Sequence, residues 1–231
     1  RESELLGGFN FGSFEEYLNR DVDSLIIDTA KRYADILEKI STNQYILMGY
    51  CVGGWIAFET ARILVERGKN VAKVVTISSS LCGHNYDNEL LLERAFALSI
   101  GADIEKAGYI GSNTLLQRAL ENFKTHNGDR AISIDELCTL SGEYEELAVG
   151  FKKLSELSQE ERLQKIFATI KKNEGDDAEN IDMFKILYKL FRHSFKGIMR
   201  YEPSIYVGDV HALFVADDTK HFFPVRDISN K

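Results

Sequence analysis

The sequence predicts an α/β fold: a mostly parallel sheet with a large helical insertion in its chain. Three observations lead to this prediction. Residues 45 to 77 follow the order strand, turn, helix, strand. From about residue 82 to 200 only helical patterns recur, and a strand pattern returns at 210 to 216. A chain of 231 residues with 44% apolar content can bury one sizeable core, so both strand regions fit into one domain.

The elements before residue 78 follow from local patterns. Residues 1 to 20 are rich in glycine and aromatic residues and predict a loop with at most a short strand. Residues 21 to 41 carry apolar residues at helical spacing and predict an amphipathic helix. The apolar run 45 to 48 and the β-branched run 71 to 77 predict two strands. With the helix between them they form a βαβ unit, whose parallel strands we expect to be buried.

The first strand and its helix are joined by a G-x-C-x-G turn, the pattern of a nucleophile elbow. Because the turn is tight, the positions two before and two after Cys51 should have no room for a side chain, and they are Gly49 and Gly53. We expect Cys51 itself to project above the sheet edge. The helix N-terminus should lower the pKa of the thiol. The Val52 N–H would then stabilise an oxyanion. The alternative interpretation is that Cys51 is a small buried core residue.

The stretch from about 82 to 200 has two interpretations: a separate helical domain, or a lid inserted into the sheet domain. The returning strand at 210 to 216 favours the lid. The charged segment 172 to 179 predicts a mobile break. Helical patterns run through 90–99, 114–124, 134–140, 144–151, 160–172 and 183–200.

Composition excludes several classes of protein. The net charge is -8, and no dense block of Lys and Arg predicts nucleic-acid binding. The three cysteines lack C-x-x-C spacing, which argues against a disulfide scaffold or zinc site and favours a reducing, cytoplasmic compartment. Cys82, His84 and Asp87 have no known ligand spacing, so we expect no metal. No apolar run predicts a membrane span, and residues 1 to 4 do not form a signal peptide.

Two ordered motifs resemble the thioesterase domains that end nonribosomal peptide and polyketide assembly lines. Residues 49 to 77 are similar to the family pattern G-Y/H-S-x-G-G-x-I/V/L-A-F/Y-E-x-A, followed by an apolar strand. Residues 199 to 216 resemble the pattern Y-x-P, then Y-x-G-x-I/V-x-L-F-x-A. The family has serine at the nucleophile position, where this chain has Cys51.

This resemblance implies an α/β-hydrolase fold. Residues 1 to 231 would form a single thioesterase-like domain, with a core at 1–81 and 201–231 and a helical lid at about 82–200. The family's first strand, its oxyanion loop and its closing G-x-H segment have no counterpart here, so the chain resembles a domain without both ends.

The resemblance also implies an activity. A thioesterase would release an acyl or peptidyl chain through a Cys51 acyl-enzyme. Because Cys51 stands at a serine-dominated position, we expect cyclisation or aminolysis rather than simple hydrolysis. The substrate would arrive on the phosphopantetheine of a carrier protein in the same multidomain chain, and no cofactor is expected. The main alternative is a degenerate module that binds a carrier protein; a carboxylesterase or lipase is a third.

The remaining catalytic groups depart from the family pattern. The family's aspartate after the second strand is replaced by Ser78, so we expect the acid at Asp217 or Asp218, although paired acids after a strand are often solvated loop residues. No histidine has the G-x-H context, and none is assigned as base. Tyr50, Ser78 and His84 are expected to line the pocket. The other four histidines have these expected roles: His211 structural, His126 and His193 surface or packing residues, and His221 a poor base.

Overall fold

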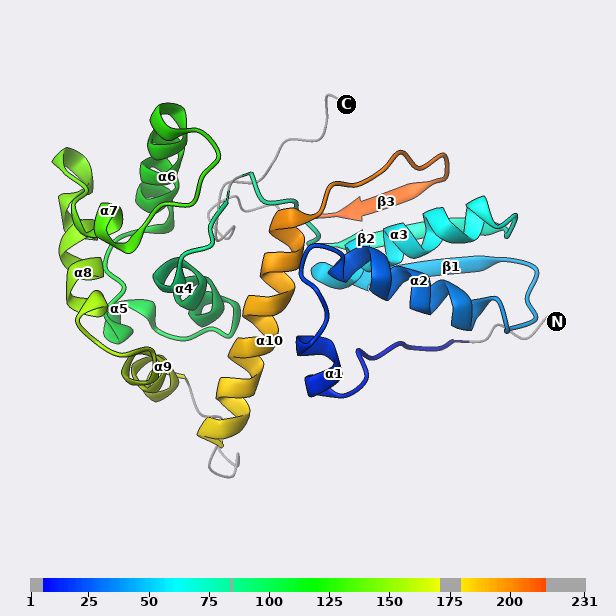
Figure 1. Cartoon of the computed structure of the whole chain (residues 1–231), viewed down its shortest axis with the longest axis horizontal. Coiled ribbons are helices and arrows are strands. Elements are labelled where there is room, and N and C mark those ends of the chain that lie inside the picture. Colours follow the sequence, from blue (N-terminus) through cyan, green and yellow to red (C-terminus); the bar gives the residue numbers. More distant parts are fainter. Residues whose placement is uncertain (1–5, 84, 171–179, 215–231) are drawn as a thin grey trace. The chain divides into compact units, whose positions relative to one another are not determined.

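The computed structural model describes residues 6–83, 85–170 and 180–214 (Figure 1). The chain divides into two compact units. Of the described residues, the sheet unit contains 6–79 and 200–214, and the helical unit contains 80–83, 85–170 and 180–199. These boundaries lie close to the predicted insertion at about 82–200. Whether the helical unit acts as a lid stays a prediction.

The sheet unit has three parallel strands in the order β1-β2-β3: β1 (Tyr45–Tyr50), β2 (Val71–Ile77) and β3 (Val210–Leu213). Helix α3 (Val52–Glu66) packs on β1 and β2, and α2 (Leu25–Leu37) packs beside α3 (Figure 1). The α/β class and the parallel sheet are therefore confirmed. At residues 14–18, where sequence allowed a loop or short strand, the structure has helix α1 (Phe14–Leu18).

The expectation that both strands of the βαβ unit are buried is wrong for β1. On β1, Ile46, Met48 and Tyr50 alternate along one face and are 61%, 64% and 69% exposed. All of β3 is exposed. Strand side chains alternate between faces, and α3 covers the face opposite these three residues. The buried positions on the helix-covered side are Tyr45 of β1 and Val74 and Thr76 of β2.

The helical unit contains the helices that the apolar spacing predicts, and adds a short one at 104–107 and a 3-10 turn at 142–144. Serine and asparagine N-caps begin most of them; Ser133 and Ser158 each form a capping box with the glutamate three residues later. The helices are α4 (Glu89–Ser99), α5 (Ile104–Ala107), α6 (Asn113–Asn127), α7 (Ile134–Cys138), α8 (Glu145–Ser155), α9 (Gln159–Ala168) and α10 (Ile181–Arg200). The charged segment 172–179 lies outside the described residues.

A buried ion pair joins α4 to α9 in this unit. Glu93 is fully buried, and Arg162 donates to both of its carboxylate oxygens, from Nε at 2.6 Å and from Nη2 at 3.0 Å. The Tyr109 hydroxyl donates to the same carboxylate at 2.9 Å. A buried charge needs such partners because desolvation is costly. The pair therefore fixes how the two helices meet.

Candidate active site

Cys51 is the single residue between strand β1 and helix α3. Its φ of 53° and ψ of -124° are uncommon for a residue other than glycine, and they produce a sharp strand-to-helix turn. The Cys51 N–H donates to the Ile77 carbonyl of β2 at 2.9 Å, and its own carbonyl accepts from the Gly54 N–H at 3.0 Å. These two hydrogen bonds, to β2 and to the first turn of α3, hold the strained backbone of Cys51 in place. The Cys51 side chain is exposed. The alternative of a buried core cysteine is wrong.

The glycines around this turn have different roles from those predicted. A Cβ on Gly49 would lie 2.0 Å from the Gly53 carbonyl oxygen, so Gly49 is required. A Cβ on Gly53 would meet nothing within 4 Å, so the expectation for Gly53 is wrong. The second required glycine is Gly54, where a Cβ would lie 1.9 Å from Ser79 Oγ. Helix α3 begins at Val52, so both Gly53 and Gly54 lie in its first turn.

The predicted lowering of the Cys51 pKa is also wrong. Desolvation by the surrounding atoms raises the pKa of this thiol, although the side chain reaches solvent, and the hydrogen bond from the Val52 N–H only partly offsets it. No charged side chain among the described residues contributes to the shift. The thiol is therefore mostly protonated at neutral pH, and it would need a base to become a nucleophile.

Three strand ends meet beside Cys51. The register pairs Tyr50 with Ile77 and Ile77 with Leu213, so the residues that follow them lie along one edge of the sheet. Ser78 follows β2 and also has a positive φ, of 49°. Its N–H donates to the Leu213 carbonyl at 2.8 Å. The two described residues other than glycine with a positive φ thus follow adjacent strands.

The other predicted site residues are placed as follows. Val52 is the first residue of α3, and its N–H reaches the Cys51 thiol. Tyr50 ends β1 with its ring exposed. His84, Asp217 and Asp218 lie outside the described residues. Their roles stay predictions.

The histidines that the structure describes do not follow a strand end. His211 lies within β3, two residues before its end, and is exposed, which differs from the packed structural role expected. His126 is exposed on α6, with Nδ1 2.8 Å from the Asn122 carbonyl oxygen. His193 is half-buried in α10. His221 lies outside the described residues.

A buried cluster links the two sequence motifs, and sequence reasoning missed it. Glu59 of α3 is 1% exposed and accepts from Tyr201 Oη at 2.6 Å and from Arg62 Nε at 2.7 Å. The Tyr201 ring lies 5.6 Å from that of Trp55. The available signal was an acidic residue inside the apolar helix pattern, together with a tyrosine in the second motif. The cluster anchors the segment that leads into β3 to the helix after Cys51.

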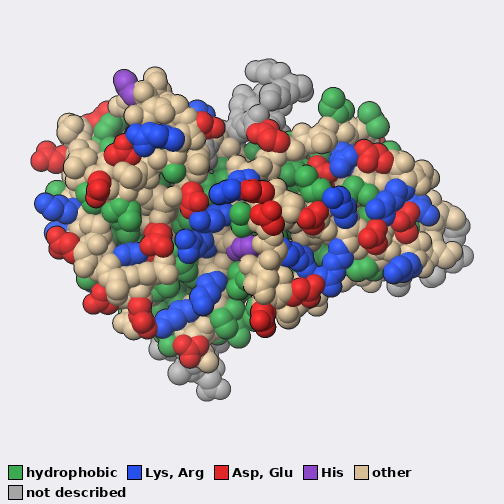
Figure 2. All heavy atoms as spheres, viewed as in Figure 1, with side chains coloured by type: hydrophobic (Ala, Val, Ile, Leu, Met, Phe, Trp, Pro, Cys, Tyr) green, Lys and Arg blue, Asp and Glu red, His purple; other side chains and the backbone are tan. Residues whose placement is uncertain are grey.

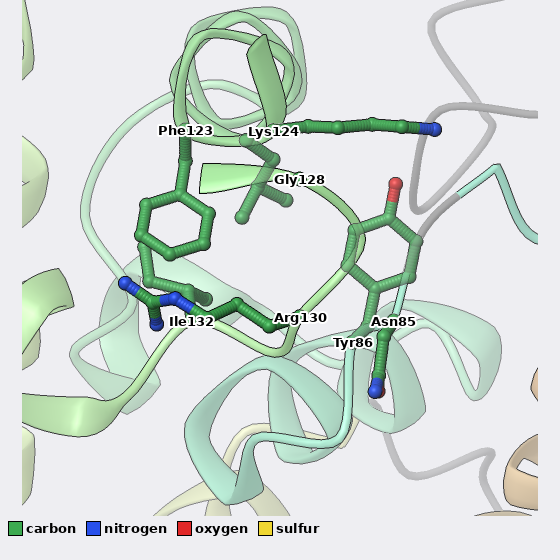
Figure 3. Close-up of a pocket in the computed structure, with 8 residues that line it drawn as sticks. Asn85, Tyr86, Phe123, Lys124, Gly128, Arg130 and Ile132 are labelled. Atoms are coloured by element: carbon green, nitrogen blue, oxygen red, sulfur yellow. The ribbon is translucent and has the colours of Figure 1, made fainter. Parts of the chain in front are cut away.

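A small cavity in the helical unit is lined by Tyr86, Phe123, Lys124 and Ile132, among others (Figure 3). Its volume is about 10 Å³, enough for one water molecule and too small for an acyl chain. In Figure 3 the Arg130 side chain lies against the Phe123 ring, with its guanidinium carbon 4.6 Å from the ring centre. This cavity is therefore not a substrate pocket.

No group of three or more His, Cys, Asp or Glu residues in the described part of the chain could hold a metal ion. None of the described helices is both long enough and apolar enough to span a membrane. On the face drawn in Figure 2, acidic and basic side chains are interspersed.

Part of this chain matches a known family, and most of it is similar to two curated proteins. The thioesterase domain family model matches residues 19–99, which contain β1, the elbow, α3 and β2. Pyochelin synthetase PchF of Pseudomonas aeruginosa PAO1 is 29% identical over 216 residues, covering 94% of this chain and 11% of that protein. PchF of strain UCBPP-PA14 is 27% identical over 223 residues, with the same coverage. This chain spans about a tenth of the length of these curated relatives.

One solved structure supports the fold. The crystal structure of holo-AB3403, a four-domain nonribosomal peptide synthetase bound to AMP and glycine, matches with a TM-score of 0.53 at 18% identity. The match covers 85% of this chain and 12% of that one. Together these findings support the sequence resemblance: residues 19–99 match the thioesterase domain family, and most of this chain is similar to a part of pyochelin synthetase PchF.

Proposed function

We propose that this domain releases an acyl or peptidyl chain from the phosphopantetheine thioester of a carrier protein through an acyl-enzyme on Cys51. The observation that carries the proposal is the geometry of Cys51: an exposed thiol at a strained turn, directly before the N-terminus of α3. Helix N-termini stabilise negative charge, and the Val52 N–H already reaches the sulfur. A backbone N–H at this place can stabilise the oxyanion of a tetrahedral intermediate.

The proposed reaction has two transfers. In the first, Cys51 Sγ attacks the thioester carbonyl, the carbon–sulfur bond of the carrier thioester breaks, and the phosphopantetheine thiol leaves with the proton that Cys51 gives up. In the second, water, an amine or a hydroxyl of the chain itself attacks the acyl-enzyme and regenerates the thiol. Because desolvation by the surrounding atoms raises the pKa of Cys51, the first transfer needs a base to accept its proton. We propose Asp217 or Asp218 as the acid that orients this base.

The cysteine favours cyclisation or aminolysis over hydrolysis. Exchange of one thioester for another is nearly neutral in free energy, so the acyl-enzyme retains the reactivity of a thioester toward amines and ring closure. Tyr50, Ser78 and His84 are proposed to line the pocket for the bound chain. The similarity to large synthetases supports a carrier protein within the same polypeptide. A cytoplasmic location and the absence of a cofactor in this domain are further parts of the proposal.

The test uses an acyl-pantetheine thioester and the same acyl group loaded on a carrier protein. We expect intact-mass spectrometry to show an acyl adduct on the parent domain and none on Cys51→Ala. Liquid chromatography of the products should show a cyclised or aminolysed chain when an amine is present. An adduct that survives in Cys51→Ala overturns Cys51 as the nucleophile. Free acid as the sole product overturns the cyclising or aminolytic route alone.

A second function, a carrier-binding module without catalysis, is favoured by one observation. Ser78 occupies the place after β2 where the related domains have their acid, and a hydroxyl cannot stabilise an imidazolium as a carboxylate does. In that case the domain binds the loaded carrier protein, and neither the parent nor Cys51→Ala forms an adduct. Binding measured by calorimetry with no adduct in either protein therefore selects the module.

A further inference from the structure

Ser79 lies immediately behind the elbow, and it is 4% exposed. Its hydroxyl donates to the Ile77 carbonyl oxygen at 3.2 Å. The same oxygen accepts the Cys51 N–H at 2.9 Å. One carbonyl at the end of β2 therefore holds both the backbone of the candidate nucleophile and the Ser79 side chain, which fixes the rotamer of Ser79 relative to Cys51.

The first turn of α3 rests on this fixed side chain. A Cβ on Gly54 would lie 1.9 Å from Ser79 Oγ, 2.7 Å from Ser79 Cβ and 3.2 Å from the Gly49 carbonyl oxygen. Gly49 in turn contacts the backbone of Gly53 and Gly54 so closely that a Cβ there would lie 2.0 Å from the Gly53 oxygen. The ends of β1 and β2 and the start of α3 thus interlock, with no room for an added methyl group at either glycine.

We infer that Ser79 is a positioning residue for the thioesterase reaction: through its contact with Gly54 it sets where the first turn of α3 lies, and so aims the Val52 N–H at Cys51 Sγ. This inference rests on the proposed function, because the oxyanion of the acyl transfer would use the same N–H. The inference gives a role to Ser79, the residue after Ser78, which stands where the resembled family has its aspartate. The nucleophile-elbow pattern does not include Ser79.

Four variants separate this role from simple packing. Gly54→Ala places a methyl group against Ser79 and should displace the first helical turn. Gly54→Ala combined with Ser79→Gly removes both clashing Ser79 atoms and should restore the turn. Gly53→Ala is the matched control: it has the same gain in helix propensity, one residue earlier in the same turn, and its Cβ meets nothing within 4 Å. Ser79→Ala removes the hydroxyl alone.

The assay is the pH dependence of iodoacetamide alkylation at Cys51, measured by peptide mass spectrometry, with the half-buried Cys138 as internal reference. Thermal unfolding identifies the variants that fold. We expect Gly54→Ala to shift the profile upward by about half a pH unit, which slows alkylation at neutral pH about threefold. The double variant should return to the parent profile, and Gly53→Ala should match it.

An unchanged Cys51 profile in folded Gly54→Ala overturns the inference, as does a double variant that stays as slow as Gly54→Ala. If Gly54→Ala does not fold, Ser79→Ala decides: a shift in the same direction supports the role and no shift overturns it. A merely structural Ser79 would lower the unfolding temperature and leave the profile in place. Alkylation uses no thioester, so a failure here is distinct from the absence of an acyl adduct, which tests the proposed function.

Discussion

The hydrogen bond between Tyr201 and Glu59 should be a major contribution to the stability of the sheet unit. Tyr201 is 5% exposed, and its hydroxyl donates at 2.6 Å to a carboxylate that is 1% exposed. Tyr201→Phe keeps the ring and removes only this donor. Hydrogen bonds to charged groups contribute about 1.5–3 kcal/mol. Because Arg62 Nε still donates to Glu59, we expect a loss of about 2 kcal/mol in the free energy of unfolding.

The assay follows from the position of the single tryptophan. Trp55 lies in the sheet unit with its ring 5.6 Å from Tyr201, so its fluorescence in urea reports the unfolding of this unit. The matched control is Tyr206→Phe. The Tyr206 ring also packs on α3, 5.5 Å from Phe58, but its buried hydroxyl has no hydrogen-bond partner among the described residues. Tyr206→Phe should therefore be neutral or slightly stabilising.

The pH dependence gives an independent check. Burial, and then the Glu59 hydrogen bond, raise the pKa of Tyr201 above its ordinary value of 10.0. Above that pH the unfolded tyrosine loses its proton while the folded one keeps it, so the stability falls by up to about 1.4 kcal/mol per pH unit for this group. Tyr201→Phe lacks this contribution, and its difference from the parent should shrink above pH 10. The reasoning is refuted if Tyr201→Phe costs no more than Tyr206→Phe.

Three other predictions concern the helical unit and the elbow. Glu93→Ala leaves Arg162 buried without its partner and should cost about 3–5 kcal/mol in the free energy of unfolding, measured in urea by circular dichroism. Lys185→Ala breaks a solvent-exposed ion pair with Glu160 and should cost much less. Equal costs would contradict a structural role for the buried pair. Ser78→Gly should gain about 0 to 1 kcal/mol, because glycine relieves the positive φ but adds entropy to the unfolded chain; a clear loss of stability would exclude backbone strain at this position. Cys51 should react with iodoacetamide ahead of Cys82 and Cys138, because its side chain is exposed and theirs are half-buried. Its rate should rise steeply from neutral to alkaline pH, because desolvation by the surrounding atoms raises its pKa. Peptide mass spectrometry at several pH values measures both, and equal rates for the three thiols would remove Cys51 as the accessible nucleophile.

The elements with strong local patterns were predictable from sequence. Strand β2 occupies the predicted residues 71–77, and α2 and α3 follow from apolar spacing at 3.6 residues per turn. Gly68 ends α3 with φ +75°, as expected of a helix terminus. Short helix α1 was missed because five residues carry too little periodicity to distinguish a helix from a loop.

Long-range contacts were not predictable in the same way. The pairing of Glu59 with Tyr201 joins residues 142 positions apart, and no periodicity reports such a contact. The exposed face of β1 was missed for a related reason. An apolar run predicts a strand, but burial depends on which helices cover each face, and α3 covers one face only.

The Cys51 environment shows where sequence reasoning about reactivity fails. The elbow pattern correctly placed the thiol at a strained turn before a helix. The lowered pKa of the Cys51 thiol was predicted from the helix dipole alone. The dipole effect is about 0.3–1 kcal/mol at an exposed site, which equals less than one pKa unit. Desolvation by the surrounding backbone opposes it and is the larger effect, so the pKa rises. A helix end thus prepares this site for the oxyanion more than for the thiolate, and the reaction depends on a base that removes the proton from Cys51.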